Sequence, residues 1–150
     1  MATIHSNLKR AGTWFCFVAI GVAAAGCAKP PGAGDYLAAK DRIISAYKIE
    51  SAKCAQVTDQ AHDVCVLRAE GDQSVALAEL AFQYSGKPED RARIALAKND
   101  ASYRVAKTLC DEQPGSAKSA CLKDAETARI EANADAQVSR TDAKAASGKG

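Results

Sequence analysis

The sequence predicts an all-α protein made of two disulfide-stapled antiparallel helical hairpins, with four helices in a small bundle or an elongated hairpin pair. Three observations predict this class. The spacing C-x10-C occurs twice, fifty-six residues apart, with different residues inside each copy. Alanine-rich segments with apolar residues at helical spacing flank each cysteine pair. Turn-forming residues, among them Pro114-Gly115, lie between the two cysteines of each pair.

The first residues have the pattern of an exported bacterial chain. A basic start, MATIHSNLKR, precedes the apolar stretch AGTWFCFVAIGVAAA, which is short for a membrane span. The following AAGC, residues 24–27, resembles a lipobox, in which signal peptidase II cuts before a cysteine that carries diacylglycerol. We therefore expect a lipoprotein signal peptide at 1–26 and lipidation of Cys27. Cleavage by the ordinary signal peptidase, which would give a soluble periplasmic chain, is the alternative.

A flexible tether is expected at 27–34, because AKPPGAG is rich in proline and glycine and disfavours helix. Ala28 follows the cysteine where an aspartate would indicate inner-membrane retention, so we expect the outer membrane, with the chain facing the periplasm. Loss of the signal removes Lys9 and Arg10 and leaves eighteen basic and eighteen acidic residues. No basic stripe with interleaved aromatics remains, so nucleic-acid binding is not expected.

The cysteine count agrees with export. Of six cysteines, Cys16 leaves with the signal and Cys27 is consumed by the lipid. Four remain, and an oxidising compartment favours their pairing. The repeated spacing selects two neighbouring pairs, because an antiparallel hairpin returns such positions to within about 4.4–6.8 Å between Cα atoms. The predicted disulfides are Cys54–Cys65 and Cys110–Cys121.

Four helices are predicted, at about 35–55, 61–84, 88–111 and 117–138. They form two hairpin repeats, 35–84 and 88–138, within one helical domain at 35–138. Gly86 is expected to end the second helix and Pro88 to begin the third. Residues 139–150 have no apolar stripe and are predicted to form a disordered tail. Alanine favours helix but buries little area, so the core is expected to be thin. A compact bundle is the first choice, and an elongated hairpin pair is the alternative.

The two hairpins align beyond their cysteines. A shift of fifty-six residues places Tyr47 on Tyr103, and Ala69-Glu70 on Ala125-Glu126. These identities keep one register across helix, turn and helix, which indicates a duplicated hairpin.

Between Asp63 and Cys121 the chain resembles a family of exported, alanine-rich helical proteins of beta-proteobacteria with repeated C-x10-C hairpins. The motifs that carry the resemblance stand in order as AHDVC, RAEG, ALAEL and FQYSGK. Some members of the family carry a TolA-like cell envelope biogenesis label. The resemblance implies export to the envelope and brings no activity with it.

Candidate chemistry is sparse. The sequence has no G-x-S-x-G and no H-E-x-x-H motif, so we expect no enzyme, no cofactor and no small-molecule substrate. His62 lies between Cys54 and Cys65, and a zinc or copper site or thiol chemistry can be drawn there. Lys118 stands at the equivalent position of the second hairpin, and a disulfide consumes the thiolates. We therefore expect His62 to be a solvated residue and the chain to bind no metal.

The sequence thus predicts a non-enzymatic, periplasm-facing lipoprotein, a structural or interaction component of the Gram-negative cell envelope. Its expected partners are the membrane, through the lipid anchor, and an envelope protein. One alternative is a periplasmic metal- or thiol-handling protein that uses the Cys54, His62 and Cys65 region. Another is a stress-related, chaperone-like binder that uses apolar helix faces.

Overall fold

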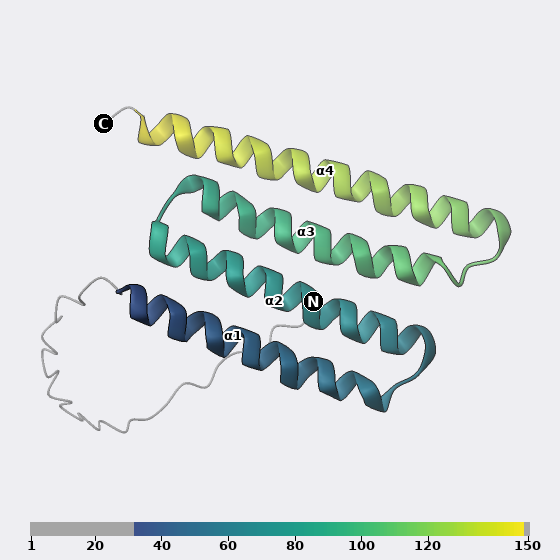
Figure 1. Ribbon diagram of the computed structural model, residues 1–150. Coiled ribbons are helices and arrows are strands. Elements are labelled where there is room, and N and C mark those ends of the chain that lie inside the picture. Colours follow the sequence, from purple (N-terminus) through teal and green to yellow (C-terminus); the bar gives the residue numbers. More distant parts are fainter. Residues whose placement is uncertain (1–31, 149–150) are drawn as a thin grey trace, which may run out of the picture. The chain divides into compact units, whose positions relative to one another are not determined.

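The computed structural model describes residues 32–148. Within them the chain forms α1 (Ala33–Lys53), a short 3₁₀ turn η1 (Cys54–Gln56), α2 (Asp59–Ser85), α3 (Pro88–Cys110) and α4 (Gly115–Ser147), and no strand (Figure 1). The all-α class and the four expected helices are confirmed. The signal peptide predicted at 1–26 lies outside the described residues. The predicted tether at 27–34 is described only from 32, and α1 already begins at Ala33.

The turn between the hairpins has the residues that were expected to form it. Gly86 has a φ of 64°, in the left-handed region that glycine adopts at low cost, and its N–H donates to the Phe82 carbonyl at 2.8 Å. Pro88 then occupies the first turn of α3, where its missing N–H leaves no donor unpaired. Local sequence therefore fixes where α2 ends and α3 begins.

The C-terminal prediction needs a correction. The sequence predicts helix only to 138 and a disordered tail from 139, whereas α4 continues to Ser147. The extension is alanine-rich, so helix propensity persists after the apolar stripe ends. Ala143, within this extension, lines a groove with Pro88 and Arg91 of α3. The added turns therefore have a tertiary neighbour.

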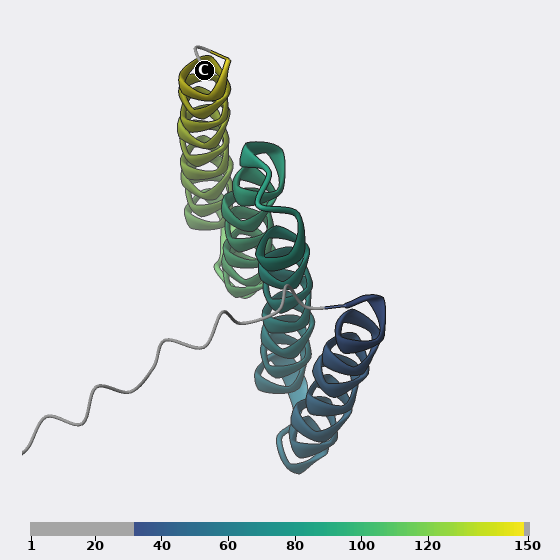
Figure 2. The same cartoon turned by 90° about the vertical axis from the view of Figure 1, so that its left-hand side faces the viewer.

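The helices lie in a single row. Among residues 32–148, each helix contacts only its neighbours along the chain: α1 packs on α2, α2 on α3, and α3 on α4. Figure 1 shows the four antiparallel helices side by side, and Figure 2 shows them one after another in a single layer. A closed bundle would bring α4 against α1, and this contact is absent among the described residues. Of the two arrangements expected from sequence, the elongated one is therefore present.

A single layer buries few side chains, because solvent reaches both of its faces. The buried apolar residues are mostly small: Cys54, Val64, Ala69, Leu80, Ala92, Cys110 and Ala136. Several large apolar residues stay exposed, namely Leu37, Ile49, Val57, Leu109, Ile130 and Val138. Burial of apolar area stabilises by roughly 25 cal/mol per Å², so this row gains little from a core. The disulfides and individual contacts between helices must carry much of its stability.

Specific contacts join each neighbouring pair of helices. Tyr36 of α1 meets Tyr84 of α2 edge to face, with ring centroids 5.1 Å apart. Gln60 of α2 donates from Nε2 to the Thr108 carbonyl of α3 at 2.8 Å.

No helix within residues 32–148 contains a segment apolar and long enough to cross a membrane.

Candidate functional site

The two predicted disulfides are present, and each closes a hairpin. Cys54 lies in η1, directly after α1, and joins Cys65 in the second turn of α2, with 5.5 Å between their Cα atoms. Cys110 is the last residue of α3 and joins Cys121 in the second turn of α4, at 5.6 Å. The first cysteine of each pair is fully buried, and the second is half-buried. The repeated spacing therefore reflects the geometry of a helix end beside a helix start.

The two turns share a backbone contact although their residues differ. The Val57 N–H donates to the Cys54 carbonyl at 3.1 Å, and the Gln113 N–H donates to the Cys110 carbonyl at 3.0 Å. These two contacts are fifty-six residues apart and use only backbone atoms. Since no side chain takes part, the residues between the cysteines vary while the spacing stays constant.

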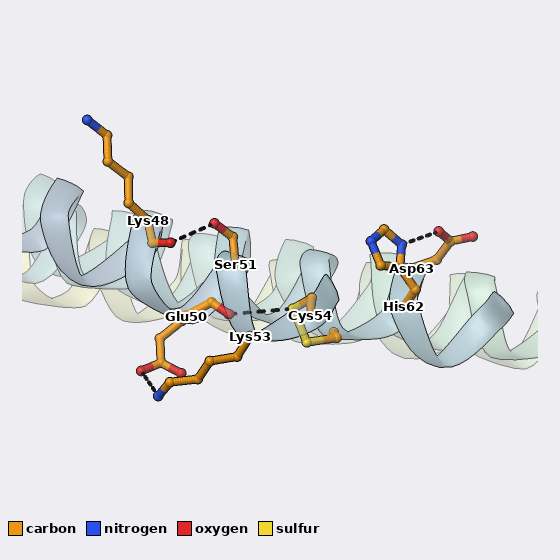
Figure 3. The surroundings of a disulfide bond; sticks show 8 residues. Lys48, Glu50, Ser51, Lys53, Cys54, His62 and Asp63 are labelled. Carbon is orange, nitrogen blue, oxygen red and sulfur yellow. Dashed lines mark hydrogen bonds and ion pairs between the residues drawn. A yellow bond between two sulfur atoms is a disulfide. The ribbon is translucent and has the colours of Figure 1, made fainter. Parts of the chain in front are cut away.

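The side chains around His62 are not arranged as a set of metal ligands. His62 is about half exposed, and its Nδ1 lies 3.4 Å from Oδ1 of the neighbouring Asp63. Figure 3 shows both side chains directed away from the disulfide at Cys54. The two sulfurs bond each other, so neither is a thiolate ligand. Within the described part of the chain, no three His, Cys, Asp or Glu side chains gather closely enough to hold an ion.

The equivalent position in the second hairpin has a structural contact. Lys118 pairs with Asp111 at 2.9 Å, across the turn between α3 and α4. An ammonium at this position is no metal ligand, and it braces the second turn instead. The two hairpins thus share their staple but not their turn chemistry.

One face of the row carries a series of open grooves. A groove of about 430 Å³ beside the first disulfide shares Arg68 and Asp72 with the next groove, between α2 and α3. That groove shares Ser102 and Ala106 with a third, between α3 and α4. The third leads through Asn99 and Ala132 into a groove of about 470 Å³. Alanine is the commonest residue lining this surface, and charged side chains, among them Arg68 and Asp72, lie between the alanines.

A polar cluster between α3 and α4 was not anticipated from sequence. Arg129 donates from two nitrogens to the Glu126 carboxylate, and its guanidinium lies 4.8 Å from the centre of the Tyr103 ring. The hydrogen bonds from Arg129 lower the pKa of Glu126. The hydrogen bond to Glu126 raises the pKa of Tyr103 above 10.0. Glu126 and Arg129 are each about one-third exposed, and the three side chains bond one another. We therefore assign the cluster to helix packing.

The sequence repeat marked two of the three residues of this cluster. Tyr103 and Glu126 both lie at positions that the fifty-six-residue repeat matches, to Tyr47 and Glu70. Arg129 has a glutamine, Gln73, at its equivalent position, so the repeat did not mark it.

The fold and its staples define an all-α protein of repeated, disulfide-closed helical hairpins. The chain matches no protein-family model, no curated protein and no solved structure. A function is therefore proposed from the geometry of residues 32–148 and from the sequence pattern that precedes them.

Proposed function

We propose that this chain is a non-enzymatic structural or interaction component of the Gram-negative cell envelope, a lipoprotein held in the outer membrane through Cys27 and facing the periplasm. In this function the helical row is a spacer and contact surface. Its partner is another envelope protein, which meets the exposed sides of the helices.

The two closed disulfides are the observation that carries this proposal. Disulfides persist in oxidising compartments and are rare in the cytosol. Here both cysteine pairs within 32–148 are bonded, and the first cysteine of each is inaccessible to solvent. The thin core gives a physical reason for them, since a layer with little burial depends on covalent staples. If the chain is exported to an oxidising compartment, both disulfides can persist. The lipobox-like AAGC supports a lipid anchor.

The metal- or thiol-handling alternative has less support. It needs Cys54 and Cys65 as thiolates, and these two sulfurs bond each other. Within residues 32–148, the His62 side chain pairs only with Asp63, an exposed neighbour on the same helix.

The chaperone-like alternative is favoured by one observation. Large apolar side chains such as Leu37 and Leu109 are exposed at 59% and 45% without any prior unfolding. A surface of this kind contacts a folded partner as readily as an unfolded chain. Dye binding that stays at background in the native protein would weigh against the alternative.

Separation of the membranes tests the proposal. We expect the wild-type chain in the outer-membrane fraction, with a mass that shows cleavage before Cys27 and added acyl chains. Cys27→Ser should move the protein to the soluble fraction or leave its precursor unprocessed. Cys16→Ser is the matched control, because it changes a cysteine of the signal and should leave the location unaltered. Recovery of the wild-type chain, unacylated, in the soluble periplasm would contradict the anchor.

A further inference from the structure

The repeat in the sequence is also a repeat in space. Helices α1 and α2 form one stapled hairpin, and α3 and α4 form the next, with equivalent cysteines bonded. The two hairpins meet only where α2 packs on α3. By the fifty-six-residue shift, α3 is the equivalent of α1. The α2–α3 contact is therefore the contact of one hairpin with the first helix of the following hairpin.

Two ion pairs cross this contact. Glu70 of α2 pairs with Arg104 of α3 at 2.5 Å, and Glu79 of α2 pairs with Lys98 of α3 at 3.4 Å. Acidic groups lie on the second helix of the first hairpin, and basic groups lie on the first helix of the next. All four side chains are one-third to more than one-half exposed, so the pairs fix register more than they add stability.

Helix α4 has acidic residues at both equivalent positions, and one of them is unpaired among the described residues. A shift of fifty-six residues carries Glu70 to Glu126 and Glu79 to Asp135. Glu126 already bonds Arg129. Asp135 is exposed and makes no ion pair with any residue of 32–148.

Helix α1 has basic residues at the two positions equivalent to the bases of α3. The same shift carries Arg104 back to Lys48 and Lys98 back to Arg42. Both residues are exposed, and neither side chain forms an ion pair within the described residues. Within the described part of the chain, Asp135 of α4 and Arg42 of α1 are therefore unpaired opposite charges at the positions where Glu79 and Lys98 bind each other inside the row.

Exposed apolar side chains accompany these charges. Ile49 on α1 is 60% exposed, and its equivalent on α3 is Val105, which lines the groove between α2 and α3. Val138 on α4 is 58% exposed, and its equivalent on α2 is Phe82, which is covered by the Arg91 guanidinium of α3 at 4.9 Å. At the α2–α3 junction Val105 and Phe82 are half-buried. Burial of Ile49 and Val138 between two copies would reproduce that arrangement.

We propose that a second copy of this chain binds head to tail, with α4 of one copy antiparallel to α1 of the next. The contact repeats the α2–α3 junction, with Asp135 paired with Arg42 as Glu79 is paired with Lys98. Such a contact joins two different surfaces, so it continues as an open row of helices or closes into a ring.

The spacing at this contact differs from the inner junction. At the α2–α3 junction Gly71 lies close against Ala101, and the equivalent positions on α4 and α1 are Thr127 and Ser45. These larger side chains hold the helices farther apart. The contact between copies is therefore expected to be weaker and reversible.

Charge reversal on each side tests the proposal. Arg42→Glu places an acid opposite Asp135, and Asp135→Arg places a base opposite Arg42. Each variant alone should self-associate about fivefold more weakly than the wild-type chain in sedimentation velocity, as expected for an exposed pair turned repulsive. An equimolar mixture of the two variants should regain the association, because every contact between unlike copies pairs opposite charges again. Helix content and intact disulfides confirm that each variant is folded.

Arg68→Glu is the matched control. Arg68 is an exposed base of α2 that makes no ion pair within 32–148 and lies away from both ends of the row. Its reversal should leave the association unchanged. A monomeric wild-type chain at all concentrations, or failure of the mixture to recover, would overturn the proposal. So would an equal effect of Arg68→Glu, which would show that the loss of association does not depend on the charges at the two ends of the row. The inference goes beyond the proposed function and does not need the anchor, since Cys27→Ser tests location and leaves Arg42 and Asp135 intact.

Discussion

Gly71 of α2 lies so close to Ala101 of α3 that a Cβ atom built on the glycine would fall 2.6 Å from the alanine Cβ. This glycine is buried inside a helix, where glycine is disfavoured by about 1 kcal/mol relative to alanine. The close approach of the two hairpins is the physical reason for its presence. The central junction of the row thus depends on the absence of one methyl group.

Gly71→Ala is therefore expected to destabilise the protein although it improves helix propensity. Overpacking costs about 1–3 kcal/mol, which exceeds the propensity gain, so the net loss should be about 1 kcal/mol. The urea midpoint measures it. Gly34→Ala is the control, since nothing lies within 4 Å of its added Cβ, and it should be neutral or slightly stabilising. Ala101→Gly in the Gly71→Ala background should recover part of the loss, because it restores the space.

Removal of either staple should cost more than any surface change. In the chain-entropy model, a disulfide that closes a loop of this length stabilises by about 2–3 kcal/mol. We expect that loss for Cys54→Ser with Cys65→Ser, and a similar loss for the equivalent pair at Cys110 and Cys121, by denaturant unfolding. The combined quadruple variant should be largely unfolded, since the core is thin. Unchanged midpoints would show that the layer holds without staples.

The cluster at Glu126 should make stability depend on acid pH. Because hydrogen bonds from Arg129 lower the pKa of Glu126 below 4.5, the folded state favours the carboxylate. Its contribution is present above the ordinary carboxyl pKa and is lost as the pH falls through the lowered value. Wild type should therefore exceed Glu126→Gln in stability at neutral pH, and this difference should shrink in acid. Thermal unfolding across pH 2–7 measures it.

Glu131→Gln controls for the loss of one charge. Glu131 is exposed on the same helix and makes no ion pair within 32–148. Its substitution should change stability little at neutral pH. A pH-independent gap between wild type and Glu126→Gln would contradict the assigned role of the Arg129 contact.

The Glu70–Arg104 pair should show measurable but small coupling. Its side chains are 36% and 40% exposed, so solvent screens the attraction. A double-mutant cycle with Glu70→Gln and Arg104→Gln should give about 0.5–1 kcal/mol. The Glu50–Lys53 pair, within α1 and more exposed at 56% and 60%, should give a smaller value. Equal coupling energies in the two pairs would show that Glu70–Arg104 contributes no more at the α2–α3 junction than an exposed pair within one helix.

Much of the fold could be predicted because its signals are local. The turn at Gly86 and Pro88, the helical spacing and the repeated cysteine interval each act within one or two helical turns. They determined four helices and both disulfides, which the structure confirms. The predicted end of α4 was wrong. The prediction required an apolar stripe, whereas alanine-rich sequence continues the helix to Ser147. The lipidation of Cys27 remains a prediction, and it lies outside 32–148.

The sequence by itself determined which segments are helices and which cysteines lie together, because hairpin geometry follows from short-range spacing. Only the tertiary structure decided that the helices form an open row, with α2 on α3 and α4 away from α1. The reason is physical: small side chains lie on several sides of these helices, so periodicity marks no single apolar face. Close approaches such as Gly71 on Ala101 then select the neighbours, and they leave the outer sides of α1 and α4 exposed.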